Sequence, residues 1–174
     1  MKILINIALV ASLLIINVSA YAADTKLVVL VRHAEKLPDG QDPSLSSAGY
    51  QRANALAEAL NGPPLQLLLA TQFNRTQQTL APIAQQRNLT VQVVPAKKPI
   101  QSHIQAIVER VNQAQGNVLI AGHSNTVPLI IKALGGQDVT DIAENDYDNL
   151  YILSITPGHP ASLISTRYGQ VPQE

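Results

Sequence analysis

The chain of 174 residues contains no cysteine and no tryptophan, and it has only one phenylalanine and one methionine. The absence of cysteine excludes structural disulfides and a lipid-modified amino-terminal cysteine. Because aromatic side chains are so few, we expect a core packed from aliphatic residues.

An excess of charge of either sign is also absent. The chain has 12 basic and 12 acidic residues, and its formal net charge is zero. This balance leaves no basic surface for nucleic acid or for an anionic membrane. Any recognition of phosphate must therefore be local and depend on a few placed side chains.

One long apolar stretch lies at the amino terminus, where Lys2 precedes Ile3–Ile16 and small residues follow at Ala20-Tyr21-Ala22. The stretch is shorter than the roughly 20 residues that span a bilayer, so it predicts a cleaved signal peptide over residues 1–22. We expect an exported protein, periplasmic or secreted, with no stable membrane insertion after cleavage. Residues 23–174 are predicted to form a single domain.

Strand-like apolar runs alternate with helical patterns along the remaining chain. The predicted strands are Lys26–Val31, Leu65–Ala70, Thr90–Val94 and Asn117–Ala121, with a closing hairpin of Leu150–Ile155 and Leu163–Thr166. The predicted helices are Ala48–Leu60, Asn74–Arg87, Ile100–Gln115 and Thr126–Leu134. This alternation predicts an α/β fold, a three-layer sandwich whose mostly parallel central sheet has helices on both faces.

Two histidines follow strand-like runs directly. Arg32-His33 follows the first predicted strand, and Gly122-His123 follows the fourth. Arg75 lies in the first turn of the helix after the second strand, from where its side chain should lean back toward the strand end. Because the carboxyl ends of parallel strands meet at one edge of a sheet, we expect these side chains to share a pocket.

Two imidazoles and two guanidiniums suit an anion of phosphate size. The amides of Ser124 and Asn125 open a helix at the same edge, and a helix amino terminus favours negative charge. An imidazole in such a pocket can also act as a nucleophile toward phosphorus. The other histidines, His103 at a helix start and His159 in a turn, are expected at the surface.

Four segments, in this order, resemble the motifs of the histidine phosphatase superfamily, also called the phosphoglycerate-mutase-like superfamily. They are Val31–Lys36, Leu45–Ala53, Thr71–Thr79 and Gly122–Thr126. The resemblance covers most of the chain after about residue 25 and is closest in form to the small bacterial exported branch. It implies a phosphoglycerate-mutase-like fold.

The resemblance also implies a reaction. His33 would be the nucleophile of a metal-independent phosphatase that forms a phosphohistidine and needs no cofactor. Arg32, Arg75 and His123 would stabilise charge on the phosphoryl oxygens, and Ser124 would join them in binding the substrate. The expected partner is a small phosphorylated substrate or a surface glycan phosphate.

The chain departs from the superfamily where a general acid is expected. The loop that carries a Glu in one branch reads Pro95-Ala96-Lys97-Lys98-Pro99, and the position of the Asp that follows the second histidine in another branch holds Ser124. Glu35 is our first candidate for the acid, although it could instead pair with Lys36 or Arg52. The other candidates lie in one acidic loop, at Asp138, Asp141, Glu144, Asp146 and Asp148.

Three functions remain open from the sequence. The first is a phosphomonoesterase, and the second is a phosphohistidine (phosphoamidate) phosphatase, whose leaving group needs little help from an acid. The third is a non-catalytic phosphate-binding pseudoenzyme. Retention of His33 favours an enzyme, because binding alone would need only the arginines.

Overall fold

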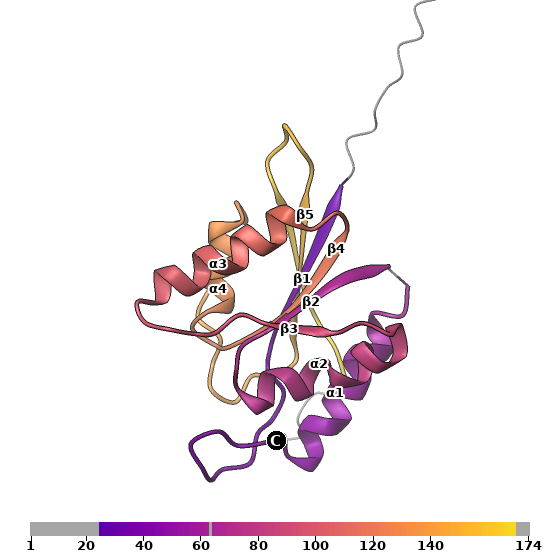
Figure 1. Cartoon of the computed structure of the whole chain (residues 1–174), viewed down its shortest axis with the longest axis vertical. Helices are drawn as coiled ribbons and strands as arrows, with labels where there is room; N and C mark the ends of the chain where they lie inside the picture. Colours follow the sequence, from indigo (N-terminus) through magenta and orange to yellow (C-terminus); the bar gives the residue numbers. More distant parts are fainter. Residues whose placement is uncertain (1–24, 63, 170–174) are drawn as a thin grey trace, which may run out of the picture.

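A mixed sheet with strand order β3-β2-β4-β1-β5-β6 lies at the centre of the computed structural model, which describes residues 25–62 and 64–169 (Figure 1). Its strands are β1 Lys26–Arg32, β2 Leu65–Ala70, β3 Val91–Val93, β4 Asn117–Gly122, β5 Asn149–Ile155 and β6 Ser162–Arg167. Strands β1 to β4 run parallel, whereas β5 pairs antiparallel with both β1 and β6. The predicted parallel sheet and closing hairpin are both confirmed. The predicted signal peptide lies outside the described residues.

Helices cover both faces of the sheet. α1 (Ser47–Ala59) and α2 (Asn74–Arg87) pack together on one face, and α3 (Ile100–Gln113) and α4 (Val127–Ala133) pack on the other (Figure 1). The three-layer α/β architecture is therefore confirmed. No helix among the described residues is long and apolar enough to cross a membrane.

Alternation along the strands divides the core in two. In β1, Val28 and Leu30 join the cluster under α3 and α4, whereas Val29 and Val31 join the cluster under α1 and α2. Successive strand residues point to opposite faces, so a sheet covered on both sides needs an unbroken apolar run of this kind. Among the described residues, every buried hydrophobic side chain except two tyrosines is aliphatic.

The start of α1 is held against the chain that leaves β1. Ser46 caps the helix as an acceptor from the amide of Gly49, at 3.2 Å, and the Ser46 amide donates to the carbonyl oxygen of Glu35 at 2.9 Å. A Cβ on Gly49 would lie 2.0 Å from that same carbonyl oxygen. Only glycine permits this close approach, which fixes the backbone two residues beyond His33.

Candidate active site

One cavity of about 420 Å³ opens at the carboxyl ends of the parallel strands β1, β2 and β4. Five of the six residues proposed from the sequence line it, namely Arg32, His33, Arg75, His123 and Ser124. The sixth, Glu35, does not belong to its lining. The parallel arrangement thus brings together residues that are separated by up to 92 positions in the chain, from 32 to 124.

One ring nitrogen of His33 is free to react with a substrate. Its side chain is 3% exposed, and its Nδ1 lies 2.8 Å from the carbonyl oxygen of Ala34. A carbonyl can only accept, so the proton of the neutral ring is on Nδ1 and Nε2 keeps its lone pair. Burial, followed by the charges of Arg32 and Arg75, lowers the pKa of His33 to about 4. The ring is therefore neutral near pH 7, as a nucleophile must be.

His123 lies beside it, with ring centroids 5.4 Å apart. Its Nε2 is 3.1 Å from the hydroxyl of Thr71, which in turn lies 2.9 Å from the hydroxyl of Thr76. Thr76 donates to the carbonyl of Phe73, so the Thr71 proton is directed to Thr76 and His123 is the donor to Thr71. Burial and the neighbouring His33 lower the pKa of His123 to about 3.

The two arginines each keep an unused donor. Arg32 is 2% exposed and donates to the carbonyls of Ala143 and Glu144 at 2.6 and 2.9 Å, yet its Nε is buried without a hydrogen-bond partner. The Arg75 guanidinium lies 4.4 Å over the ring of Phe73, and its Nε is likewise buried and unpartnered. A buried donor without a partner costs about 1–3 kcal/mol. Both arginines also line the cavity, where their positive charge favours an anion.

The positive charges in the cavity act on one another. Burial, together with the nearby charge of Arg32, lowers the pKa of Arg75, although the Asp42 carboxylate 3.7 Å away acts in the opposite direction. Two guanidiniums held close together in a partly buried site repel each other. A phosphate bound between them would relieve that repulsion.

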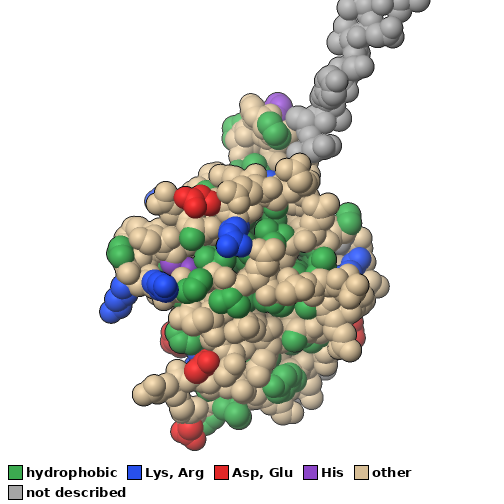
Figure 2. All heavy atoms as spheres, in the orientation of Figure 1, with side chains coloured by type: hydrophobic (Ala, Val, Ile, Leu, Met, Phe, Trp, Pro, Cys, Tyr) green, Lys and Arg blue, Asp and Glu red, His purple; other side chains and the backbone are tan. Residues whose placement is uncertain are grey.

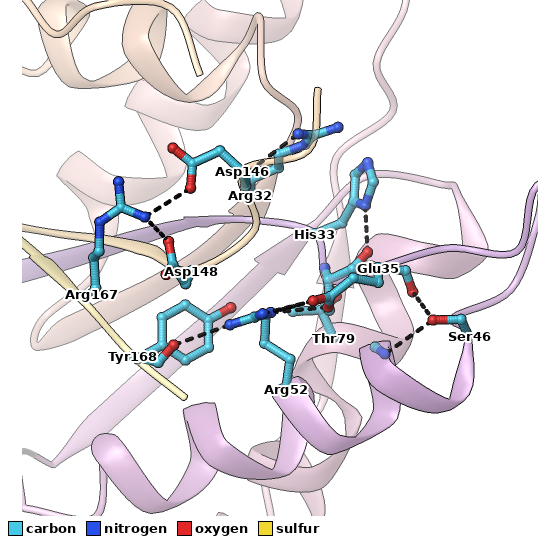
Figure 3. A network of polar contacts seen from close by, with 12 residues as sticks. Arg32, His33, Glu35, Ser46, Arg52, Thr79, Asp146, Asp148, Arg167 and Tyr168 are labelled. Atoms are coloured by element: carbon cyan, nitrogen blue, oxygen red, sulfur yellow. Dashed lines mark hydrogen bonds and ion pairs between the residues drawn. The ribbon is translucent and has the colours of Figure 1, made fainter. Parts of the chain in front are cut away.

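Glu35 points away from the histidines. Its carboxylate accepts from Nε of Arg52 at 2.8 and 2.9 Å and pairs with Nη2 of that arginine at 2.7 Å (Figure 3). The pairing with Arg52 considered from the sequence is thus the one observed. In this position Glu35 holds α1 to the β1 loop, and its geometry does not support the role of general acid.

Two other candidate acids are also engaged elsewhere. Asp146 pairs with Arg167 at 3.1 Å, and Asp148 pairs with the same guanidinium (Figure 3). Among the described residues, Glu144 is the one carboxylate in the cavity lining. It is 86% exposed and lies 3.1 Å from Nη2 of Arg32 and 3.4 Å from the Ser124 hydroxyl.

The expectation that His103 lies at the surface is wrong. His103 is 3% exposed, lines the same cavity and directs Nδ1 to the carbonyl of Pro95 at 3.2 Å. Its position one helical turn before Ile107 places it on the buried stripe of α3, a signal that was available in the sequence. His159 is exposed in its turn, as expected.

The sequence also did not single out several other residues of the lining, among them Lys36, Lys97, Lys98 and Phe73. The two adjacent lysines follow β3, so the rule that placed His33 and His123 at this edge applies to them as well. Within residues 25–62 and 64–169, no group of three or more His, Cys, Asp or Glu side chains is arranged to hold a metal ion.

Comparisons with known proteins agree with this description. A family model described as histidine phosphatase superfamily (branch 1) matches residues 28–98, a segment that includes His33 and Arg75. The comparison with curated protein sequences found no significant match.

Solved structures share the fold. Protein histidine phosphatase SixA in complex with tungstate has a TM-score of 0.66 and 18% identity, over 81% of this chain and 96% of that chain. Alpha-ribazole phosphatase from Shigella flexneri has a TM-score of 0.65 and 17% identity, over 81% and 96%. A mycobacterial glucosyl-3-phosphoglycerate phosphatase has a TM-score of 0.62 and 14% identity, over 83% and 99%.

Proposed function

We infer that this chain is a member of the histidine phosphatase superfamily and a phosphoric monoester hydrolase. The family match over residues 28–98 and the fold shared with solved phosphatase structures support this proposal. One observation carries the proposal. A neutral His33 with a free Nε2 lines the same cavity as two arginines whose buried Nε donors lack partners. A nucleophile and two guanidinium groups that line one cavity are what phosphoryl transfer requires.

The reaction then runs in two displacements. Nε2 of His33 attacks phosphorus, and the bond from phosphorus to the leaving oxygen breaks, which leaves the phosphoryl group on the ring. Water next attacks phosphorus, the bond from phosphorus to Nε2 breaks, and the ring of His33 is regenerated as inorganic phosphate leaves. Arg32, Arg75 and a His123 that is held by Thr71 stabilise the negative charge on the phosphoryl oxygens in both steps.

The leaving oxygen needs a proton when it belongs to an alcohol. We propose that Glu144 supplies it, because it is the carboxyl group in the described lining and reaches both Arg32 and Ser124. A substrate phosphate that takes over Arg32 frees this carboxyl group at the mouth of the cavity. There it is positioned to exchange a proton with the departing group.

A phosphohistidine phosphatase is the second candidate. The loop after β3 carries no carboxylate, and Glu35 is occupied by Arg52. A phosphoamidate substrate, whose nitrogen leaving group requires less help, would suit such a site if Glu144 does not act as an acid. A pseudoenzyme that only binds phosphate would have no use for the free Nε2 of His33.

Export to the periplasm or the medium stays a proposal that rests on the amino-terminal pattern of residues 1–22. It favours a small phosphorylated molecule or a surface glycan phosphate as substrate. Fractionation of expressing cells tests it: retention of the full-length chain with the cytosol would contradict export.

The nucleophile is tested by His33→Ala. The variant should lose all but about 0.1% of the wild-type turnover of an aryl phosphate, since Nε2 of His33 is the proposed nucleophile and Nε2 of His123 is engaged by Thr71. Rapid quenching in alkaline detergent after mixing with labelled substrate should trap an acid-labile, alkali-stable phosphoryl group on the wild-type protein and none on the variant. His159→Ala, in the exposed turn, is the control. Substantial turnover by a folded His33→Ala protein would exclude the covalent mechanism.

A further inference from the structure

The mouth of the cavity holds more positive charge than one phosphate needs. Five of the chain's 12 Lys and Arg residues line it, whereas Glu144 is the one acidic residue of the described lining. Figure 2 shows lysine and arginine side chains around a histidine at the left of the molecule, where α3 begins in Figure 1. Because the net charge of the chain is zero, this concentration of positive charge at one cavity indicates a binding site for anions.

The lysines of this group come from two separate loops. Lys36 lies between β1 and α1, and Lys97 and Lys98 lie between β3 and α3. Within residues 25–62 and 64–169, none of the three forms an ion pair with an Asp or Glu. Their charges are therefore not used to hold the fold together.

The loop that carries Lys97 and Lys98 is nevertheless well anchored. The Ala96 amide donates to the side chain of Gln72 at 2.8 Å, and the Pro95 carbonyl accepts from both the Lys97 amide and His103, at 2.9 and 3.2 Å. The burial of His103 thus has a structural use. It fixes the backbone from which the two lysines project at the rim of the cavity.

The distribution of donors separates two anion positions. Arg32 and Arg75 offer buried nitrogen atoms next to His33, which suits the phosphoryl group that is transferred. Lys97 and Lys98 are exposed and Lys36 is half-buried, so their ammonium groups remain in contact with water at the cavity mouth. Lys36 and His33 line the same cavity, and the charge of Lys36 contributes to the lowered pKa of His33.

We propose, on the basis of the phosphatase function inferred above, that Lys36, Lys97 and Lys98 form a second anion subsite and that the substrate carries a second phosphate near the scissile one. A compact ammonium on a flexible stem binds a phosphate as a point charge and accepts varied geometry. The same loop holds no carboxylate that would repel such a group. The substrate class is therefore a molecule that carries two phosphates close together.

Paired substrates test the subsite. For the wild-type protein we expect kcat/KM for a hexose bisphosphate to exceed that for the matching hexose monophosphate by about tenfold or more, beyond the twofold statistical factor. In Lys97→Gln/Lys98→Gln that ratio should fall to about twofold, and Lys97→Arg/Lys98→Arg should restore most of it. Lys132→Gln, on α4 and outside this cavity, should leave the ratio as in the wild type. A ratio within one variant is insensitive to a general loss of activity.

A binding measurement keeps this test separate from that of the function. Calorimetric titration of His33→Ala with the same two sugars reports on the subsite even if no substrate is turned over. Tighter binding of the bisphosphate that depends on Lys97 and Lys98 and weakens with added salt supports the subsite. A third ligand, a sugar phosphate with a carboxylate in place of the second phosphate, distinguishes phosphate recognition from attraction to any anion. Equal affinities for the monophosphate and the bisphosphate, or a preference that survives Lys97→Gln/Lys98→Gln, would overturn the proposal.

Discussion

His33 and His123 hold their protons on different ring nitrogens, and the difference suits different tasks. The Ala34 carbonyl keeps the His33 proton on Nδ1, whereas the Thr71 hydroxyl accepts from Nε2 of His123. The first arrangement leaves Nε2 of His33 free to act as a nucleophile. The second arrangement orients a ring that can take up positive charge when an anion enters the site.

The proposed role of Glu144 as the general acid can be tested by changing this one carboxylate. Glu144→Gln should lower turnover of a sugar phosphate by about 10²- to 10⁴-fold but change turnover of an activated aryl phosphate by less than about fivefold, because only the poor leaving group needs a proton. The measurement is kcat for both substrates under identical conditions.

Glu35→Gln is the matched comparison, since it makes the same chemical change at a carboxylate that faces Arg52. We expect it to affect both substrates equally. If Glu35→Gln discriminates between the leaving groups and Glu144→Gln does not, the assignment of Glu144 is wrong.

The start of α1 holds the loop that follows His33, so the geometry of the site depends on it. In Gly49→Ala the new Cβ would meet the Glu35 carbonyl oxygen at 2.0 Å, so either the helix or the loop after His33 must move. We expect the free energy of unfolding to fall by about 1–3 kcal/mol, as for overpacked interiors, with a parallel loss of phosphatase activity. Urea unfolding and aryl phosphate turnover measure the two effects.

Gly62→Ala provides the control for this substitution. Nothing lies within 4 Å of a Cβ at that position, so stability should change by less than about 0.5 kcal/mol. A Gly49→Ala protein as stable and active as Gly62→Ala would show that the close contact with Glu35 does not constrain the loop.

At the scale of the whole molecule, buried neutral histidines make stability depend on pH. The pKa values of His33 and His123 are lowered to about 4 and about 3, below the value of about 6.5 for an unfolded chain. Between these limits the unfolded state binds more protons than the folded state, so stability rises with pH and is lost on acidification. We expect the free energy of unfolding to fall by about 1–3 kcal/mol per histidine between about pH 7 and pH 4.

Denaturant unfolding across this pH range checks the expectation. His33→Gln/His123→Gln should show a flatter pH dependence than the wild type, whereas His159→Gln, in the exposed turn, should follow the wild-type curve. A double variant with the full wild-type slope would mean that other groups cause the acid sensitivity.

The location of the site at the carboxyl ends of the parallel strands was predictable from the sequence. It depends only on local apolar patterns and on the rule that parallel strands end at the same edge of a sheet. Unbroken apolar runs indicated strands buried on both faces, and the alternating helices indicated parallel pairing. Parallel strands end at the same edge, so His33 and His123, which directly follow β1 and β4, had to lie near each other. The Ser46 cap was equally local, since it needs only a hydroxyl in front of a helix.

The tertiary structure decided which polar side chains face the cavity. Glu35 and Glu144 are both carboxylates in loops, and nothing in their immediate sequence shows that Arg52 of α1 draws one away while Arg32 holds the other at the cavity. The burial of His103, by contrast, could have been predicted from the sequence, because the residue lies one helical turn before Ile107 on the apolar stripe of α3. Loop side chains are placed by partners distant in the chain, whereas the ends of strands are placed by the periodic backbone of the sheet.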